Sequence, residues 1–142
     1  MVNDMILFTA GSLGRLVRRI VDRNLKSIGL TSAQIRVLLF ISRTGSVHQK
    51  EIEEALLLTR ATVSAMVDTL ESMGLIVRQK DSSDARAWHI VITEKGLQKL
   101  EEAKESTDIV ESTMLSVLSD NEKDMYMDIS KKLRNVLEEN LC

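Results

Sequence analysis

The sequence predicts a mainly α-helical fold with one small β-hairpin, of the α+β class. Apolar residues recur at spacings of three and four along most of the 142 residues, and proline is absent. Residues 87–93 instead alternate apolar with small or polar side chains, as a strand does. The glycines that lie where helices or strands are expected to end are Gly29, Gly45, Gly74 and Gly96. At this length we expect a single domain, residues 1–142.

Two short helices are predicted near the centre of the chain. The first covers Gln49–Leu56, and Thr59 can cap a second helix that covers Arg60–Met73. Gly74 ends that helix, because glycine adopts the left-handed conformation without steric cost. The apolar stripe of the second helix is Val63, Val67 and Leu70, with Met66 and Met73 at its edge.

A β-hairpin is predicted next, with strands at 75–80 and 87–93 joined by a loop at 81–86. Trp88, Ile90 and Ile92 alternate with smaller or more polar residues, which is typical of a half-buried strand. Helix, turn, capped helix and hairpin form the order of parts in a winged helix-turn-helix, here residues 31–93. In that motif the second helix enters a DNA groove.

Long amphipathic helices are predicted on both sides of this motif. The first covers residues 5–28, with apolar residues at Ile6, Ala10, Leu13, Val17 and Ile20. Capping residues for the later helices are Thr31 with Gln34, Thr93, and Ser119 with Glu122. Apolar residues also recur through the last two helices, within 94–142. The stripes favour dimerisation through 1–28 and 94–142, but they are also consistent with a helical layer inside a monomer.

Five segments in the expected order resemble the MarR-type transcriptional regulators. They are Leu30-Thr-Ser-Ala-Gln34, Thr59-Arg-Ala-Thr-Val-Ser64, Leu70-Glu-Ser-Met-Gly-Leu-Ile76, Asp84-Ala-Arg86 and Ile92-Thr-Glu-Lys-Gly96. The resemblance implies a homodimer in which the first, fifth and sixth helices of two chains interlock. It also implies sequence-specific binding of double-stranded DNA at a pseudo-palindromic operator, with repression relieved by a small ligand.

The resemblance places the DNA contacts on the second motif helix and on the hairpin. Arg86 is expected to reach the minor groove and Asp84 to orient the hairpin, while Ala85 stands where relatives often carry another arginine. The helix residues expected to face DNA are Thr59, Arg60, Thr62, Ser64, Ala65 and Thr69. Their small side chains let the backbone approach base edges. Asp68 would repel phosphate, so we expect it to pair with Arg60 or a hairpin residue.

The resemblance also implies a small aromatic or carboxylate effector, bound where the dimer helices meet the winged domain. The residues expected near it are Leu13, Arg15, Leu16, Val17, Arg36 and Leu38. Arg15 or Arg36 could anchor a carboxylate in a pocket that is otherwise apolar.

No enzymatic, cofactor or metal site is predicted. Paired glutamates lie on helix faces rather than in a cleft, and neither a phosphate-binding glycine loop nor a Ser-His-Asp order is present. The two histidines, His48 and His89, lie on different elements with no cysteine nearby, which makes a poor ligand set. The single cysteine, Cys142, precludes an internal disulfide.

The charge distribution leaves one alternative function open. Net charge is −2 overall, with +4 over residues 1–42, −1 over 43–93 and −5 over 94–142. DNA contact would depend on a few placed cations, and the alternative is a winged-helix protein-interaction module without specific DNA binding. No apolar run approaches the ~20 residues that cross a bilayer, and no signal segment is evident. We therefore expect a cytoplasmic protein without a membrane partner.

Overall fold

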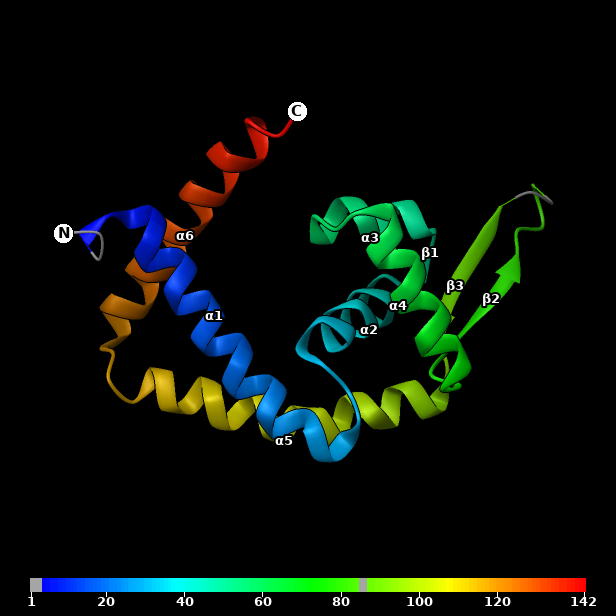
Figure 1. Ribbon diagram of the computed structural model, residues 1–142, viewed down its shortest axis with the longest axis horizontal. Coiled ribbons are helices and arrows are strands. Elements are labelled where there is room, and N and C mark those ends of the chain that lie inside the picture. The colour runs from blue at the N-terminus through cyan, green and yellow to red at the C-terminus, as the bar shows by residue number, and fades with distance from the viewer. Residues whose placement is uncertain (1–3, 85–86) are drawn as a thin grey trace. The chain divides into compact units, whose positions relative to one another are not determined.

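The computed structural model describes residues 4–84 and 87–142. Its elements are α1 (Ile6–Leu25), η2 (Lys26–Ile28), α2 (Ser32–Thr44), β1 (Ser46–Val47), α3 (Gln49–Leu56), α4 (Arg60–Ser72), β2 (Ile76–Lys80), β3 (Trp88–Ile92), α5 (Glu94–Leu115) and α6 (Asp120–Glu139). Six α-helices with a small antiparallel sheet confirm the predicted fold class (Figure 1). The chain forms two compact units, Met1–Thr107 and Asp108–Cys142, and α5 runs through the boundary between them.

The core of the first unit is formed mainly by α2, α3, α4 and the sheet. Leu38, Ile52 and Leu75 are fully buried in it. The predicted stripe of α4, namely Val63, Val67 and Leu70, is also fully buried, and Met66 and Met73 pack against the core. Helical periodicity therefore identified the inward face of α4 correctly.

The helix ends follow the predicted capping chemistry. Thr31 and Gln34 cap α2 reciprocally, and Ser119 and Glu122 do the same for α6. Thr93 Oγ1 accepts a hydrogen bond from Gly96 N at 3.1 Å at the start of α5. Gly74 has a φ of 75° just after α4, the left-handed conformation expected for the residue that ends this helix.

The sheet has one strand more than predicted. The strand order is β1-β3-β2, all antiparallel, and the two residues of β1 pair Ser46 with Val91 and Val47 with Ile90. The longer β2–β3 pair is the predicted hairpin, which projects beyond α3 and α4 in Figure 1. Ile90 is buried, whereas Trp88 is 47% exposed, so the hairpin is buried only at its base.

The long helices expose many apolar side chains. On α1 these include Ile6, Leu13, Leu16 and Ile20, and within the described residues α6 has no buried side chain at all. No single described helix is long and apolar enough to cross a membrane. One combination, Ile6–Ile28 with Ser32–Thr44, passes on length and composition, but it is bent by 80°.

Candidate nucleic-acid interface

The start of α4 presents a small, polar surface. Thr62, Ala65 and Thr69 are exposed and follow one another at spacings of three and four, so they share one face of the helix. Arg60 and the half-buried Ser64 lie on the flank instead, because their spacing places them away from that face. The structure thus divides the predicted surface into an outer face and a flank.

Thr59 organises the hydroxyl groups at this end of the helix. Its Oγ1 accepts a hydrogen bond from Thr62 N at 3.2 Å and donates to Thr62 Oγ1 at 2.8 Å. The hydroxyl of Thr62 is therefore held in place while its own proton remains able to point outward. The hydroxyl of Thr69 donates to Ala65 O at 3.0 Å, so its proton is already used inside the helix.

Arg78 on β2 clamps the hairpin to α4. Its guanidinium contacts Asp68 Oδ1 at 2.6 Å and Glu71 Oε1 at 2.8 Å, and its backbone N–H donates to Glu71 Oε2 at 3.2 Å. The hydrogen bond to Asp68 is the main reason that the pKa of Arg78 lies above its usual value. The expectation that Asp68 pairs with a hairpin residue is confirmed, and the partner is Arg78 rather than Arg60.

Arg60 lies beside a hollow between α3, α4 and the sheet. The hollow has a volume of about 700 Å³, and the residues that line it are His48, Gln49, Lys50, Glu53, Arg60, Arg78, Trp88 and Ile90. Three of these side chains are cationic. Nearby, the Lys80 ammonium lies 5.5 Å from the centroid of the Trp88 ring. Several cations therefore lie between the start of α4 and the hairpin, although Glu53 and the carboxylates paired with Arg78 offset part of their charge.

The described part of the hairpin loop is shaped by backbone and carboxylate contacts. Asp81 N donates to Ala87 O at 3.0 Å, and Ala87 N donates to Asp84 O at 3.1 Å. Asp84 is exposed, as a residue at the tip should be. Arg86, with Ala85, lies outside the described residues, so its contact with the minor groove stays a prediction.

Two histidines from different elements meet near the loop end of the hairpin strands. The His48 and His89 ring centroids lie 4.5 Å apart, and His89 Nε2 lies 2.9 Å from Asp81 Oδ2. Hydrogen bonds from Ser83, first from its backbone N–H, lower the pKa of the Asp81 carboxyl. The two histidines lie on different elements, as predicted, but the unpredicted strand β1 brings His48 opposite His89.

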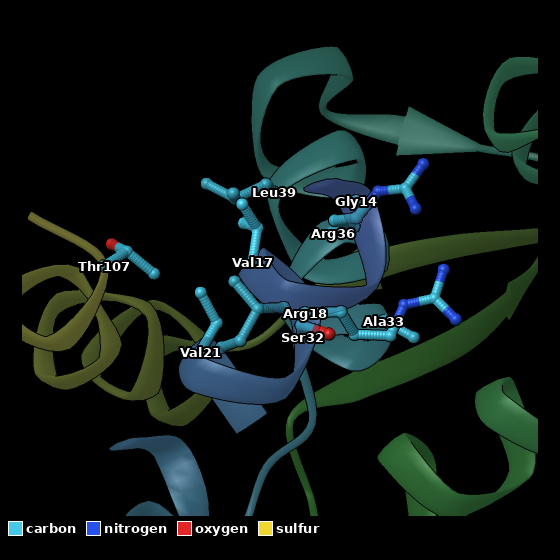
Figure 2. A pocket seen from close by; sticks show the side chains of 10 residues that line it. Gly14, Val17, Arg18, Val21, Ser32, Ala33, Arg36, Leu39 and Thr107 are labelled. Carbon is cyan, nitrogen blue, oxygen red and sulfur yellow. The ribbon is translucent and has the colours of Figure 1, made fainter. Parts of the chain in front are cut away.

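A second hollow lies between α1 and α2. It has a volume of about 340 Å³ and is lined by Gly14, Val17, Arg18, Val21, Ser32, Ala33, Ile35, Arg36, Leu39 and Thr107. Figure 2 shows apolar side chains on one side and both guanidinium groups extending toward the other. This volume is within the usual range for a site that binds a small molecule.

This pocket contains only part of the set expected near an effector. Val17 and Arg36 line it, and Arg18 provides a second cation that the sequence did not single out. Leu38 requires correction, because it is 0% exposed in the core and no ligand could reach it without displacing that core. The other three residues, Leu13, Arg15 and Leu16, are exposed on α1 and are not among the lining residues.

Comparisons with known proteins identify a family of regulators to which this chain is similar. A family model described as the MarR family matches residues 28–87. The HTH-type transcriptional repressor MdtR of Bacillus subtilis strain 168 is 31% identical over 130 residues, which is 89% of this chain and 84% of MdtR. Transcriptional regulator HosA of Escherichia coli is 30% identical over 106 residues, 75% of this chain and 78% of HosA. These relatives are regulators and not enzymes.

Solved structures of the regulator CouR are also similar to this chain. CouR bound to a 23-mer DNA duplex matches with a TM-score of 0.87 and 25% identity, over 94% of each chain. CouR from Rhodococcus jostii RHA1 bound to p-coumaroyl-CoA matches with a TM-score of 0.79 and 26% identity, over 97% of this chain and 92% of CouR.

Proposed function

The chain belongs to the MarR family of transcriptional regulators, and from this premise we propose that it is a homodimeric repressor that leaves its operator when a small ligand binds. The observation that carries the proposal is the outer face of α4. Thr62, Ala65 and Thr69 are short enough for the helix backbone to approach base edges, and the carboxylates of Asp68 and Glu71 are paired with Arg78. CouR, a relative in fold, has been seen on a DNA duplex.

The exposed apolar side chains of the long helices support dimerisation. Those of α6 are Met125, Tyr126, Met127, Ile129, Leu133, Val136 and Leu137. A monomer rarely leaves so many large apolar side chains of one helix in water, whereas a second copy would cover them. Family membership implies that the first, fifth and sixth helices of two chains interlock, and two α4 helices can then meet one duplex.

Light scattering at micromolar concentration should give twice the chain mass of 16.0 kDa. Leu133→Lys should shift the protein toward the monomer, because it places a charge on the apolar stripe of α6. Asn135→Lys, on the opposite side of that helix, should leave the mass unchanged. A folded wild-type monomer at this concentration would contradict the proposed dimer.

The pocket between α1 and α2 supports release by a small aromatic or carboxylate effector. Val17, Val21 and Leu39 offer an apolar surface to a ring, while Arg18 and Arg36 offer cations to a carboxylate. CouR, whose solved complex contains p-coumaroyl-CoA, binds an aromatic acyl compound. Because α2 also packs in the core of the winged part, a ligand at this pocket can bias the position of α4.

Competition binding tests whether α4 reads sequence. DNA fragments selected by the protein should contain a pseudo-palindrome with half-site centres about 10 base pairs apart, since a two-fold dimer meets one face of the duplex twice. Thr62→Ala should cost about 1–3 kcal/mol on that site, because it removes the outward hydroxyl and methyl, and little on scrambled DNA.

Arg86→Ala is the contrasting variant, because a contact with the minor groove and its phosphates carries little sequence information. It should weaken binding to both DNAs. The slope of log affinity against log salt concentration should become shallower by about 0.9 for each phosphate that the variant no longer neutralises. Equal losses on both DNAs for Thr62→Ala would mean that Thr62 only positions the protein. No preference by the wild type would favour the protein-interaction alternative.

A further inference from the structure

Three side chains that the proposed function does not use converge near the loop end of the hairpin strands. His48 precedes α3, Asp81 follows β2, and His89 lies on β3. One ligand atom from each lies within 4.8 Å of the other two, and all three side chains are half-buried. We propose that His48, Asp81 and His89 bind a divalent transition-metal ion of the zinc class.

The hydrogen bonding of His48 suits a metal ligand. Its Nδ1 lies 3.1 Å from the carbonyl oxygen of Trp88. A carbonyl can only accept, so Nδ1 carries the proton and Nε2 keeps a lone pair. Metal-binding histidines almost always donate their other ring N–H to a carbonyl or carboxylate in this way, because it fixes the tautomer and the ring orientation.

Asp81 is oriented by its neighbour in the same manner. Its Oδ1 accepts hydrogen bonds from Ser83 N at 2.9 Å and from Ser83 Oγ at 2.7 Å. The other oxygen, Oδ2, faces His89 Nε2 at 2.9 Å. An ion that takes both atoms as ligands replaces the proton they share, and that proton leaves to solvent.

The donor set determines which ions fit. Two imidazole nitrogens and one carboxylate oxygen are borderline ligands that favour Zn²⁺ and its neighbours over Mg²⁺ or Ca²⁺, which prefer oxygen alone. In a tetrahedral site with bonds of about 2.0–2.1 Å, the ligand atoms lie about 3.3 Å apart. The ligand atoms of this cluster lie within 4.8 Å of one another, so the two that are farthest apart must approach by up to roughly 1.5 Å. Rotation of half-buried side chains can provide this. Water would complete the fourth position.

The position of the site gives the ion a structural consequence. Asp81 and His89 belong to the hairpin, while His48 precedes the first residue of α3. The ion would therefore join the hairpin to the start of α3, whereas the Arg78 clamp joins it to α4.

Calorimetric titration with ZnCl₂ tests the site in the full chain without an affinity tag. Cys142→Ser is the parent, because the exposed terminal thiol could bind zinc by itself. We expect one ion per chain and a higher melting temperature with zinc. Asp81→Asn, which keeps the shape of the side chain, and His48→Gln should each weaken zinc binding about tenfold or more. Ser82→Ala, at an exposed residue of the same loop, should bind zinc as the parent does.

Nuclear magnetic resonance of the parent gives a second test that needs no site variant. The chain has only two histidines, and both are in the proposed site. One equivalent of zinc should therefore shift the ring nitrogen signals of both residues together. Zinc affinity that persists unchanged in Asp81→Asn, ring signals that do not respond, or the absence of binding by the parent would each overturn the proposal.

Discussion

Gly96→Ala should destabilise the protein by about 3 kcal/mol, at the upper end of what overpacking usually costs. A Cβ at this position would overlap the backbone oxygen of Leu75 and lie 2.6 Å from Ile92 Cγ1. The backbone oxygen cannot turn aside, because it accepts a hydrogen bond from Thr93 N at 3.0 Å. Urea unfolding at fixed protein concentration, followed by circular dichroism, measures the loss.

Gly14→Ala is the matched control, since it makes the same change inside another helix. Within the described residues nothing lies within 4 Å of a Cβ at Gly14. Alanine is favoured over glycine in a helix interior by roughly 0.5–1 kcal/mol, so this variant should be at least as stable as the wild type. If both variants unfolded at the same urea concentration, the close approach of α5 to Leu75 would not constrain the fold.

The elements of the winged part could be predicted because their ends have local chemical signals. Thr31, Thr59 and Thr93 each supply a side-chain oxygen to the first turn of a helix, and Gly74 takes the left-handed conformation that ends α4. These signals act within four residues of the chain, so sequence alone was sufficient. The predicted ends of α3 are the observed ones, and α4 ends one residue earlier than predicted.

Strand β1 could not be predicted, and the histidine cluster was missed with it. Two residues, Ser46 and Val47, are too few to show alternation, and their strand exists only because they pair with β3. That pairing joins segments far apart in the sequence and places His48 opposite His89. A contact of this range depends on register, which the sequence pattern of a two-residue strand cannot specify.

The sequence predicted the residues of the α4 surface better than those of the pocket between α1 and α2. Helix geometry separated the buried stripe of α4 from its exposed residues, but the predicted set also included Arg60 and Ser64, which the structure places on the flank. An apolar residue on a helix, by contrast, can line a pocket or fill the core with the same spacing. Leu38 fills the core and Val17 lines the pocket, and only tertiary packing distinguishes them.

Arg78→Met should weaken binding to every DNA sequence by about tenfold, on the premise that α4 is the helix that enters the groove. Methionine keeps the apolar stem but leaves Asp68 and Glu71 without their cation. Repulsion between a freed carboxylate and a phosphate 4 Å away reduces the binding free energy by up to about 1 kcal/mol in water, and by less at longer distances. Stability should fall by about 1 kcal/mol, because the Asp68 and Glu71 side chains are 65% and 39% exposed, and water screens both ion pairs.

Neutralising the two carboxylates separates this mechanism from direct DNA contact by Arg78. In the Arg78→Met background, Asp68→Asn with Glu71→Gln should restore most of the missing affinity, because the repulsion is then removed. The same pair of changes in the wild-type background should weaken DNA binding little. Fluorescence anisotropy with selected and scrambled duplexes measures all four proteins. If the triple variant binds as poorly as Arg78→Met, then Arg78 contacts the DNA itself. In that case the ion pairs of Arg78 with Asp68 and Glu71 would not be the reason that these carboxylates do not repel the phosphates.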